Sequence, residues 1–149
     1  QALAHAEEAH ARGDWPTGAV IVRAGPGGGR LLGSGQNRQV STGDPLLHAE
    51  PDAIRQAAAA HGAAALQGAT LYCTMEPCPM CAGALKLAGI TRLVLALRHA
   101  TLRRSDLGDF TVERFCAMTA HAMTVTDGVM EEPYMALRRR WGRDPVAPG

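Results

Sequence analysis

The stretch Leu71–Leu85, LYCTMEPCPMCAGAL, predicts a buried strand that leads directly into a helix. Residues 70–74 form a short apolar run, which is typical of a strand covered on both faces. Proline is favoured in the first turn of a helix, and Pro79 opens the Ala/Leu-rich run 79–88. The Cys-Pro-Met-Cys segment therefore lies where the strand ends and the helix begins.

Outward from this stretch, the chain alternates between helical and strand patterns. Helices are expected over residues 2–12, 48–61, 111–120 and 130–141, and strands over 18–23, 30–35, 92–97 and 123–126. We interpret the glycine-rich tract Gly25–Gly29 as a plain hairpin connector, because a strand rather than a helix follows it. The alternation implies βαβ units, a largely parallel sheet and helices on both faces. Residues 1–149 are expected to form a single α/β domain.

The composition of the chain bears on whether nucleic acid or a membrane is a partner. The net charge is +1, so no strong field that attracts nucleic acid is expected. No stretch reaches the ~20 apolar residues of a membrane span, and no secretory signal is visible. In a domain of this size, a Cys-x-x-Cys pair is more typical of a metal or redox motif than of a disulfide. We therefore expect a cytoplasmic protein with no membrane partner.

Cys78 and Cys81 are candidate metal ligands. Their i, i+3 spacing at a helix start places both sulfurs on one side, and the positive end of the helix favours thiolates, which bind zinc well. His48, at the start of another predicted helix, is the third candidate. A structural zinc site needs four protein ligands, and the sequence has no second Cys-x-x-Cys and no His-x3-His. Three ligands and an open position, the catalytic pattern, are therefore predicted.

Glu50 is the candidate catalytic residue. It lies two residues after His48, close enough to reach a water on the metal without binding the metal itself. Zinc lowers the pKa of such a water toward ~7, and a neighbouring carboxylate can take its proton and pass it on. His-x-Glu followed by Pro-Cys-x-x-Cys is the signature of zinc deaminases that act on nucleobases.

These motifs resemble the cytidine-deaminase-like superfamily, in particular the branch of tRNA adenosine deaminases, guanine deaminases and fungal cytosine deaminases. The matching stretches span most of residues 2–98 and are Trp15–Val22, Gly35–Arg38, Asp44–Glu50 and Leu71–Leu85. The resemblance implies a three-layer α/β/α sandwich. Its five-stranded mixed sheet would have the order 2-1-3-4-5, with the fifth strand parallel to the fourth.

The resemblance also assigns roles at the site. It implies zinc on His48, Cys78 and Cys81, with Glu50 as the proton shuttle. It implies that Asn37 hydrogen-bonds the substrate ring. Relatives pair through the helices over 48–61 and 79–88 to complete the pocket, so a homodimer is expected.

Pro51 departs from the family pattern, because relatives usually carry an apolar residue after His-Ala-Glu. Proline suits a first helical turn. It also biases the preceding residue, Glu50, away from helical angles. The departure concerns the geometry of Glu50 more than its role.

The segment 105–110 is a candidate substrate rim, because it follows the fourth predicted strand. Guanine deaminases carry an acidic stretch here that helps to hold the base, and Asp109 resembles its counterpart, with Phe110 as a stacking candidate. Asp109 could equally be the N-cap of the helix at 111. The tRNA enzymes usually have a loop rich in Asp, Lys, Gly and Ala here, which this chain lacks. This difference favours a small substrate.

The remaining cysteines, histidines and arginines have simpler interpretations. Cys73 and Cys116 are expected in the core. The histidines outside the motif are expected to be surface or structural residues: His5, His10, His61, His99 and His121. The arginines that could suggest nucleic acid are expected to be solvated: Arg103, Arg104 and Arg138–Arg140.

Three functions remain open. The first is deamination of a free nucleobase or related aminoheterocycle, guanine-like or cytosine-like, with release of ammonia. The second is tRNA adenosine-to-inosine deamination. The third is a zinc-stabilised binding module without catalysis, which predicts the loss of Glu50, whereas Glu50 is present.

Overall fold

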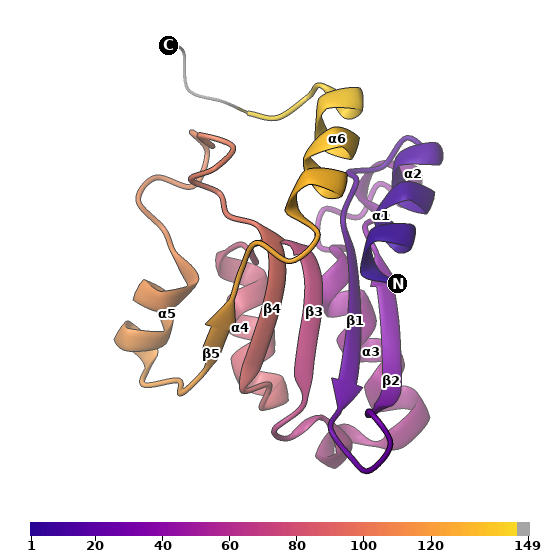
Figure 1. Ribbon diagram of the computed structural model, residues 1–149, viewed down its shortest axis with the longest axis vertical. Helices are drawn as coiled ribbons and strands as arrows, with labels where there is room; N and C mark the ends of the chain where they lie inside the picture. The colour runs from indigo at the N-terminus through magenta and orange to yellow at the C-terminus, as the bar shows by residue number, and fades with distance from the viewer. Residues whose placement is uncertain (146–149) are drawn as a thin grey trace.

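A five-stranded sheet runs through the centre of the computed structural model, which describes residues 1–145 (Figure 1). The strands are β1 (Gly18–Arg23), β2 (Arg30–Gln36), β3 (Thr70–Met75), β4 (Arg92–Leu97) and β5 (Thr124–Thr126). Their order is β2-β1-β3-β4-β5, with β1 antiparallel to both of its neighbours and β4 parallel to both of its own. The expected mixed sheet, its order and its parallel fifth strand are confirmed.

Helices cover both faces of this sheet. They are α1 (Ala2–Ala11), α2 (Gln39–Thr42), α3 (Ala49–His61), the 3₁₀ helix η1 (Ala63–Leu66), α4 (Pro79–Ala88), α5 (Val112–Thr119) and α6 (Glu131–Trp141). Every predicted helix is present, whereas α2 and η1 were not predicted, because four residues are too few to show a helical apolar period. Within residues 1–145, none of the helices has both the length and the apolar character that crossing a bilayer requires. The predicted domain also includes residues 146–149, which lie outside the described residues.

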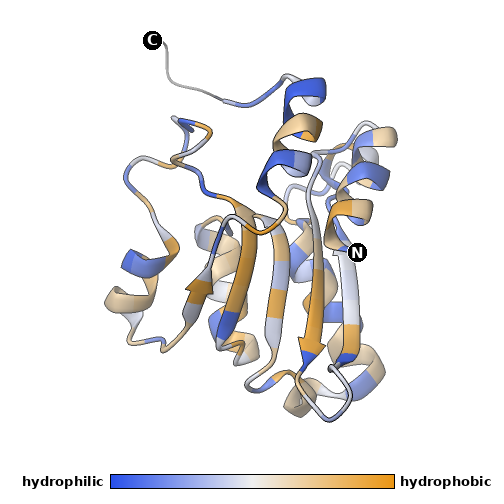
Figure 2. Cartoon of the chain, in the orientation of Figure 1, coloured by the Kyte–Doolittle hydropathy of each residue, from blue (hydrophilic) through white to orange (hydrophobic). Residues whose placement is uncertain are grey.

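The helices form one layer on each face of the sheet, as an α/β/α sandwich requires. In Figure 1, α3 and α4 lie behind the sheet and α1 and α6 lie in front of it. Helix α5 joins the rear layer, because it contacts α4 and its Phe115 and Cys116 pack against the rear core. The central strands are largely apolar (Figure 2), and a cluster of buried side chains fills each interface. The rear cluster supports the two helices that carry the candidate ligands.

A glycine on β2 sets how closely α3 approaches the sheet. A Cβ atom on Gly35 would lie 2.1 Å from the carbonyl oxygen of Ala49 and 2.4 Å from the amide nitrogen of Ala53. These separations are far inside van der Waals contact, so a larger residue would force α3 away from β2. The alanines spaced four apart on α3 are fully buried: Ala49, Ala53 and Ala57. This packing holds the first turn of α3, and the His48 that precedes it, against the sheet.

The start of α4 follows β3 through a short turn. Cys78 is the N-cap residue, with extended backbone angles of φ −70° and ψ 173°, and Pro79 is the first helical residue. The helix ends at Gly89, whose φ of 72° is left-handed and suits glycine. Helices α3 and α4 contact each other behind the sheet, so their N-termini lie close together.

Candidate metal centre and the adjoining cavity

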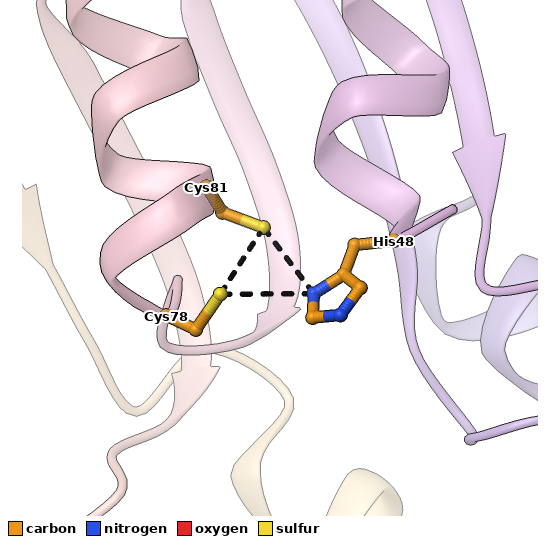
Figure 3. A group of neighbouring side chains, drawn as sticks. All are labelled: His48, Cys78 and Cys81. Atoms are coloured by element: carbon orange, nitrogen blue, oxygen red, sulfur yellow. Dashed lines mark hydrogen bonds between the residues drawn. The ribbon is translucent and has the colours of Figure 1, made fainter. Parts of the chain in front are cut away.

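Three candidate ligands converge where the N-termini of α3 and α4 meet (Figure 3). His48 precedes α3, whereas Cys78 and Cys81 belong to the start of α4. The Nδ1 atom of His48 lies 3.7 Å from the Sγ atom of Cys78 and 3.4 Å from that of Cys81. The two sulfur atoms are 3.6 Å apart. The structure thus brings together the three residues that the sequence selected as ligands.

The spacing of this triad fits a zinc ion. Nitrogen and sulfur ligands at about 2.0–2.3 Å from a tetrahedral zinc lie roughly 3.5–3.8 Å from one another. The three observed separations run from 3.4 to 3.7 Å. Within residues 1–145, no other His, Cys, Asp or Glu joins the group. Two sulfurs and one imidazole with an open position are the donor set of a catalytic zinc site rather than a structural one.

The pKa values of the two cysteines of the triad are shifted in opposite directions. The hydrogen bond between the sulfurs lowers the pKa of Cys78 to about 4, and the contact with His48 assists although burial opposes it. The same hydrogen bond, together with burial, raises the pKa of Cys81 well above its usual value. Burial lowers the pKa of His48, but the contact with Cys78 and the charge of Glu50 give a net rise. The lowered pKa of Cys78 favours its thiolate form, and metal binding would release the remaining protons of the triad.

Glu50 lies on the first turn of α3 beside the triad. Its side chain is buried, and its Oε2 atom has no hydrogen-bond partner among residues 1–145. Burial, followed by the nearby charge of Cys78, raises the pKa of Glu50 to about 7. Its Oε1 atom lies 3.9 Å from the Sγ atom of Cys73, whose thiol pKa is raised by burial. A carboxyl group with a free oxygen in this position is suited to accept a proton and release it again.

Pro51 does not remove Glu50 from the helix. Both residues lie within α3, in its first turn. The missing N–H of a proline costs nothing there, because the first N–H groups of a helix have no partner within it. The departure from the family pattern is therefore compatible with a helical Glu50 that remains next to the ligands.

A polar cavity of about 190 Å³ adjoins the triad, and His48 and Cys78 form part of its wall. Sites for drug-sized ligands usually measure about 300–1,000 Å³, so this cavity suits a single small ring. A larger cavity of about 400 Å³ lies on the front face of the sheet, between α1 and α6. Its wall is apolar and contains none of the three ligands, so we take the smaller, polar cavity as the candidate active site.

Asn37 lies at the wall of the polar cavity, as expected of a residue that contacts a substrate ring. Its side chain is buried, and its Oδ1 atom accepts a hydrogen bond of 3.1 Å from the backbone N–H of Gln39. Its Nδ2 atom donates to the side chain of Gln39 at 2.8 Å. An amide nitrogen has two protons, so Asn37 keeps one donor for a ligand while its orientation is fixed.

Asp109 and Phe110 lie outside this cavity and line a neighbouring one beneath the β4–α5 loop. The side chain of Asp109 is 89% exposed and pairs with Arg114. Asp109 is also not the N-cap of α5, because Thr111 is the N-cap and its side chain accepts from the backbone N–H of Arg114. The acid of this loop that does line the polar cavity is Asp106.

The β4–α5 loop is anchored by Glu76, a role that the sequence analysis did not detect. The buried carboxylate of Glu76 accepts hydrogen bonds from the backbone N–H groups of His99 at 3.0 Å and Val112 at 3.1 Å. It also contacts Arg98 at 3.4 Å. One side chain thus ties both ends of the loop to the end of β3, next to the ligands. The available signal for this role was the position of the acid in Glu-Pro-Cys, directly after the buried strand and before the ligand motif.

His99, expected to be a surface or structural residue, is buried rather than on the surface, and it also lines the polar cavity. Burial lowers the pKa of its imidazole, and the Glu76 carboxylate opposes this effect. A lone histidine after a strand gives no sequence signal for such a position, because its burial depends on contacts made by distant segments.

Two arginines that were expected to be solvated are largely buried at the rim of the polar cavity. The side chain of Arg104 is 11% exposed and pairs with Asp106, and that of Arg138 is 1% exposed and pairs with Asp144. Arg104 lies over the ring of Trp15, with 5.6 Å from its guanidinium carbon to the ring centroid. Arg103, Arg139 and Arg140 are exposed, as predicted. The solvated interpretation is therefore wrong for the two rim arginines.

Comparison with protein families matches residues 1–97 to the model of the cytidine and deoxycytidylate deaminase zinc-binding region. A tRNA(Ile)-lysidine synthase from Deinococcus deserti is 36% identical over 97% of the chain, which spans only 28% of the length of that relative. A guanine deaminase from Bacillus subtilis is 34% identical over 74% of the chain and 68% of its own length.

A solved structure from a study of A-to-I editing by tRNA:A34 deaminases is also similar. It superposes with a TM-score of 0.77 at 35% identity, covering 91% of this chain and 94% of that one. Similar proteins therefore include both a guanine deaminase and a tRNA deaminase, and the match to the family model covers the two motifs that supply the triad.

Proposed function

The chain belongs to the cytidine and deoxycytidylate deaminase zinc-binding family, and from that premise we propose that it hydrolytically deaminates a free nucleobase-type ring, guanine-like or cytosine-like. The observation that carries this proposal is the 190 Å³ polar cavity beside the ligand triad. A cavity of this size and a buried carboxylate with a free oxygen also argue against a binding module without catalysis.

His48, Cys78 and Cys81 would hold the zinc. Bound zinc supplies a water whose pKa is lowered toward ~7, and which is therefore nucleophilic at neutral pH. Glu50 accepts a proton at its Oε2 atom and delivers it to the departing amino nitrogen. The oxygen of a water molecule bonds to the ring carbon that carries the amino group and the C–N bond breaks, so that the aminated ring and water give the carbonyl ring and ammonia.

The polar residues around the cavity would orient the ring. Asn37 has a free amide proton for a ring acceptor, and Asp106 offers a carboxylate that can accept from ring N–H or amino groups. The net charge of +1 also supports a small substrate, because binding of RNA depends largely on Lys and Arg that neutralise phosphates. Asp109 and Phe110 remain candidates only if the β4–α5 loop changes conformation when the ring binds.

The alternative substrate is an adenosine of tRNA, and two observations favour it. The similar solved structure comes from a study of tRNA:A34 deaminases. In addition, Trp15 and Arg104 lie together at the rim of the cavity, and aromatic and arginine side chains stack on unpaired bases. An enzyme of this kind would still insert a single flipped base into the cavity.

A substrate panel with zinc-loaded protein tests the proposal. We would measure ammonia release from guanine, cytosine, adenine and their nucleosides, and inosine formation in a tRNA anticodon stem-loop. We expect turnover of at least one free ring. Turnover of the stem-loop alone would replace the proposal by its alternative, and no turnover of any substrate would refute both.

We also propose a single domain and a homodimer, with a cytoplasmic setting supported by the four free cysteines. The alanine stripe of α3 packs on the sheet, but α4 exposes Leu87 at 87% and the adjacent α5 exposes Met118 at 80%. Exposed apolar side chains on contacting helices are suited to an interface. Light scattering at micromolar concentration should give twice the monomer mass, and a monomer would contradict the dimer.

A further inference from the structure

His99 is a buried polar residue that the reaction described above does not use. The residue is 6% exposed, and its backbone N–H donates to the carboxylate of Glu76 at 3.0 Å. His99 lies between two cavities, since it lines both the polar cavity beside the triad and the one beneath the β4–α5 loop. The backbone of His99 is thus fixed while its ring borders the space where a substrate would bind.

Neither ring nitrogen of His99 has a hydrogen-bond partner among residues 1–145. The carbonyl of Pro77 is close enough to act on the ring but falls short of hydrogen-bond geometry. Within that part of the chain, the one other fully buried side-chain polar atom without a partner is Oε2 of Glu50. Unpaired buried polar atoms are costly and rare in folded proteins. His99 lines the polar cavity, and Glu50 lies two residues after His48, which also lines it, so both groups are placed to serve a ligand there.

The two arginines at this wall already have partners. Arg104 is paired with Asp106 through two hydrogen bonds, of 2.8 and 2.5 Å. Arg138 is paired with Asp144. Asn37 keeps one free amide proton, whereas the imidazole of His99 has no partner within residues 1–145 at either of its ring nitrogens. A neutral imidazole offers one donor and one acceptor.

Resting on the proposed function, we propose that His99 determines specificity, its imidazole hydrogen-bonding a heteroatom of the substrate ring away from the reacting carbon. A site built around such a hydrogen bond rejects analogues that lack the matching atom far more strongly than an apolar wall does. His99 is thereby a residue that selects the ring, whereas Glu50 acts on it.

The test combines variants of His99 with substrate analogues that are each altered at one position of the ring. His99→Phe keeps a planar ring but removes both nitrogens, and His99→Gln restores one donor and one acceptor. We would measure kcat and KM for guanine, 7-deazaguanine and 9-methylguanine, and for cytosine and 1-methylcytosine, with zinc-loaded protein. If only the stem-loop is turned over, stem-loops that carry 7-deazaadenosine or 1-deazaadenosine allow the same comparison. His61→Phe, at the far end of α3, is the matched control.

We expect His99→Phe to raise KM for the preferred ring at least about tenfold, with kcat within threefold and the zinc content unchanged. The wild type should discriminate against one analogue, and His99→Phe should lose that discrimination, which His99→Gln partly restores. An equal loss of kcat/KM for every ring together with a lower Tm would show a structural role and overturn the assignment. Values of kcat and KM within threefold of wild type for every ring would overturn it as well.

Binding calorimetry separates this inference from the proposed function. A wild type that neither deaminates nor binds any ring or stem-loop refutes the proposed function. A wild type that binds 8-azaguanine but no better than His99→Phe leaves the proposed function standing and refutes the role of His99. Weaker binding by His99→Phe, with partial recovery in His99→Gln, supports it.

Discussion

The ligand triad and the β4–α5 loop border the same cavity, but they are built in different ways. The triad depends on two short motifs, each at the start of a helix, and α3 and α4 bring the motifs together against one sheet. The loop, residues 98–111, is held by distant segments: Glu76 binds both of its ends, and Ser105 donates to the carbonyl of Pro145 at 2.9 Å. Under the proposed function, local motifs therefore supply the reacting groups, and long-range contacts shape the wall that selects the ring.

The largest effect is expected on the triad side. Cys81→Ser should abolish zinc binding and reduce activity below detection, because two donors cannot hold the ion that the site needs. Metal analysis by mass spectrometry and an ammonia assay measure the two effects. Cys116→Ser on α5, whose cysteine lies outside the triad, is the control and should keep both. Zinc retained at one ion per chain in Cys81→Ser would disprove the ligand set.

Glu50→Ala should separate chemistry from metal binding. The variant should keep its zinc and its fold but lose about 10³–10⁴-fold in kcat, since general acid–base catalysis contributes up to about that factor. Steady-state kinetics and metal content are measured on the same sample. Glu131→Gln, an exposed carboxylate in the first turn of α6, should behave as wild type. Activity of Glu50→Ala within tenfold of wild type would remove Glu50 from the mechanism.

Gly35→Ala tests whether the sheet positions the triad. The added Cβ would lie 2.1 Å from the carbonyl oxygen of Ala49, so α3 must shift. Overpacking of this kind typically costs about 1–3 kcal/mol, so a thermal melt should show a Tm roughly 5 °C lower, with weaker zinc binding. Gly83→Ala meets no atom within 4 Å and should stabilise α4 slightly. Equal Tm values for Gly35→Ala and Gly83→Ala would show that β2 does not set the position of α3.

The smallest effect distinguishes the two acids of the loop. Asp109→Ala should leave KM and kcat within twofold of wild type, because its carboxylate is exposed and lies outside the polar cavity. Asp106→Ala should raise KM several-fold, because it removes the carboxylate that accepts from the ring and leaves Arg104 at the cavity wall without its partner. Turnover lost in Asp109→Ala but not in Asp106→Ala would restore the sequence-based assignment and require the loop to close over the ring.

The same contrast explains what could be predicted from sequence. Helices and strands were predictable because glycines such as Gly89 end them and apolar runs define them, and the triad was predictable because each motif is contiguous. The burial of Arg138 and His99 was not, since it depends on partners far along the chain such as Asp144 and on packing between separate elements. Asp109 was assigned to the substrate on its position after β4, but a loop of this length can direct neighbouring acids into different cavities.

The most direct test of this division of roles is one set of kcat/KM ratios. We would compare two or more rings that the wild type deaminates, using zinc-loaded wild type, Glu50→Asp and His99→Phe. The account predicts that Glu50→Asp lowers kcat/KM by a common factor and leaves the ratios between rings within twofold of wild type. His99→Phe should change at least one ratio tenfold or more. Ratios that change in Glu50→Asp and stay constant in His99→Phe would contradict the account.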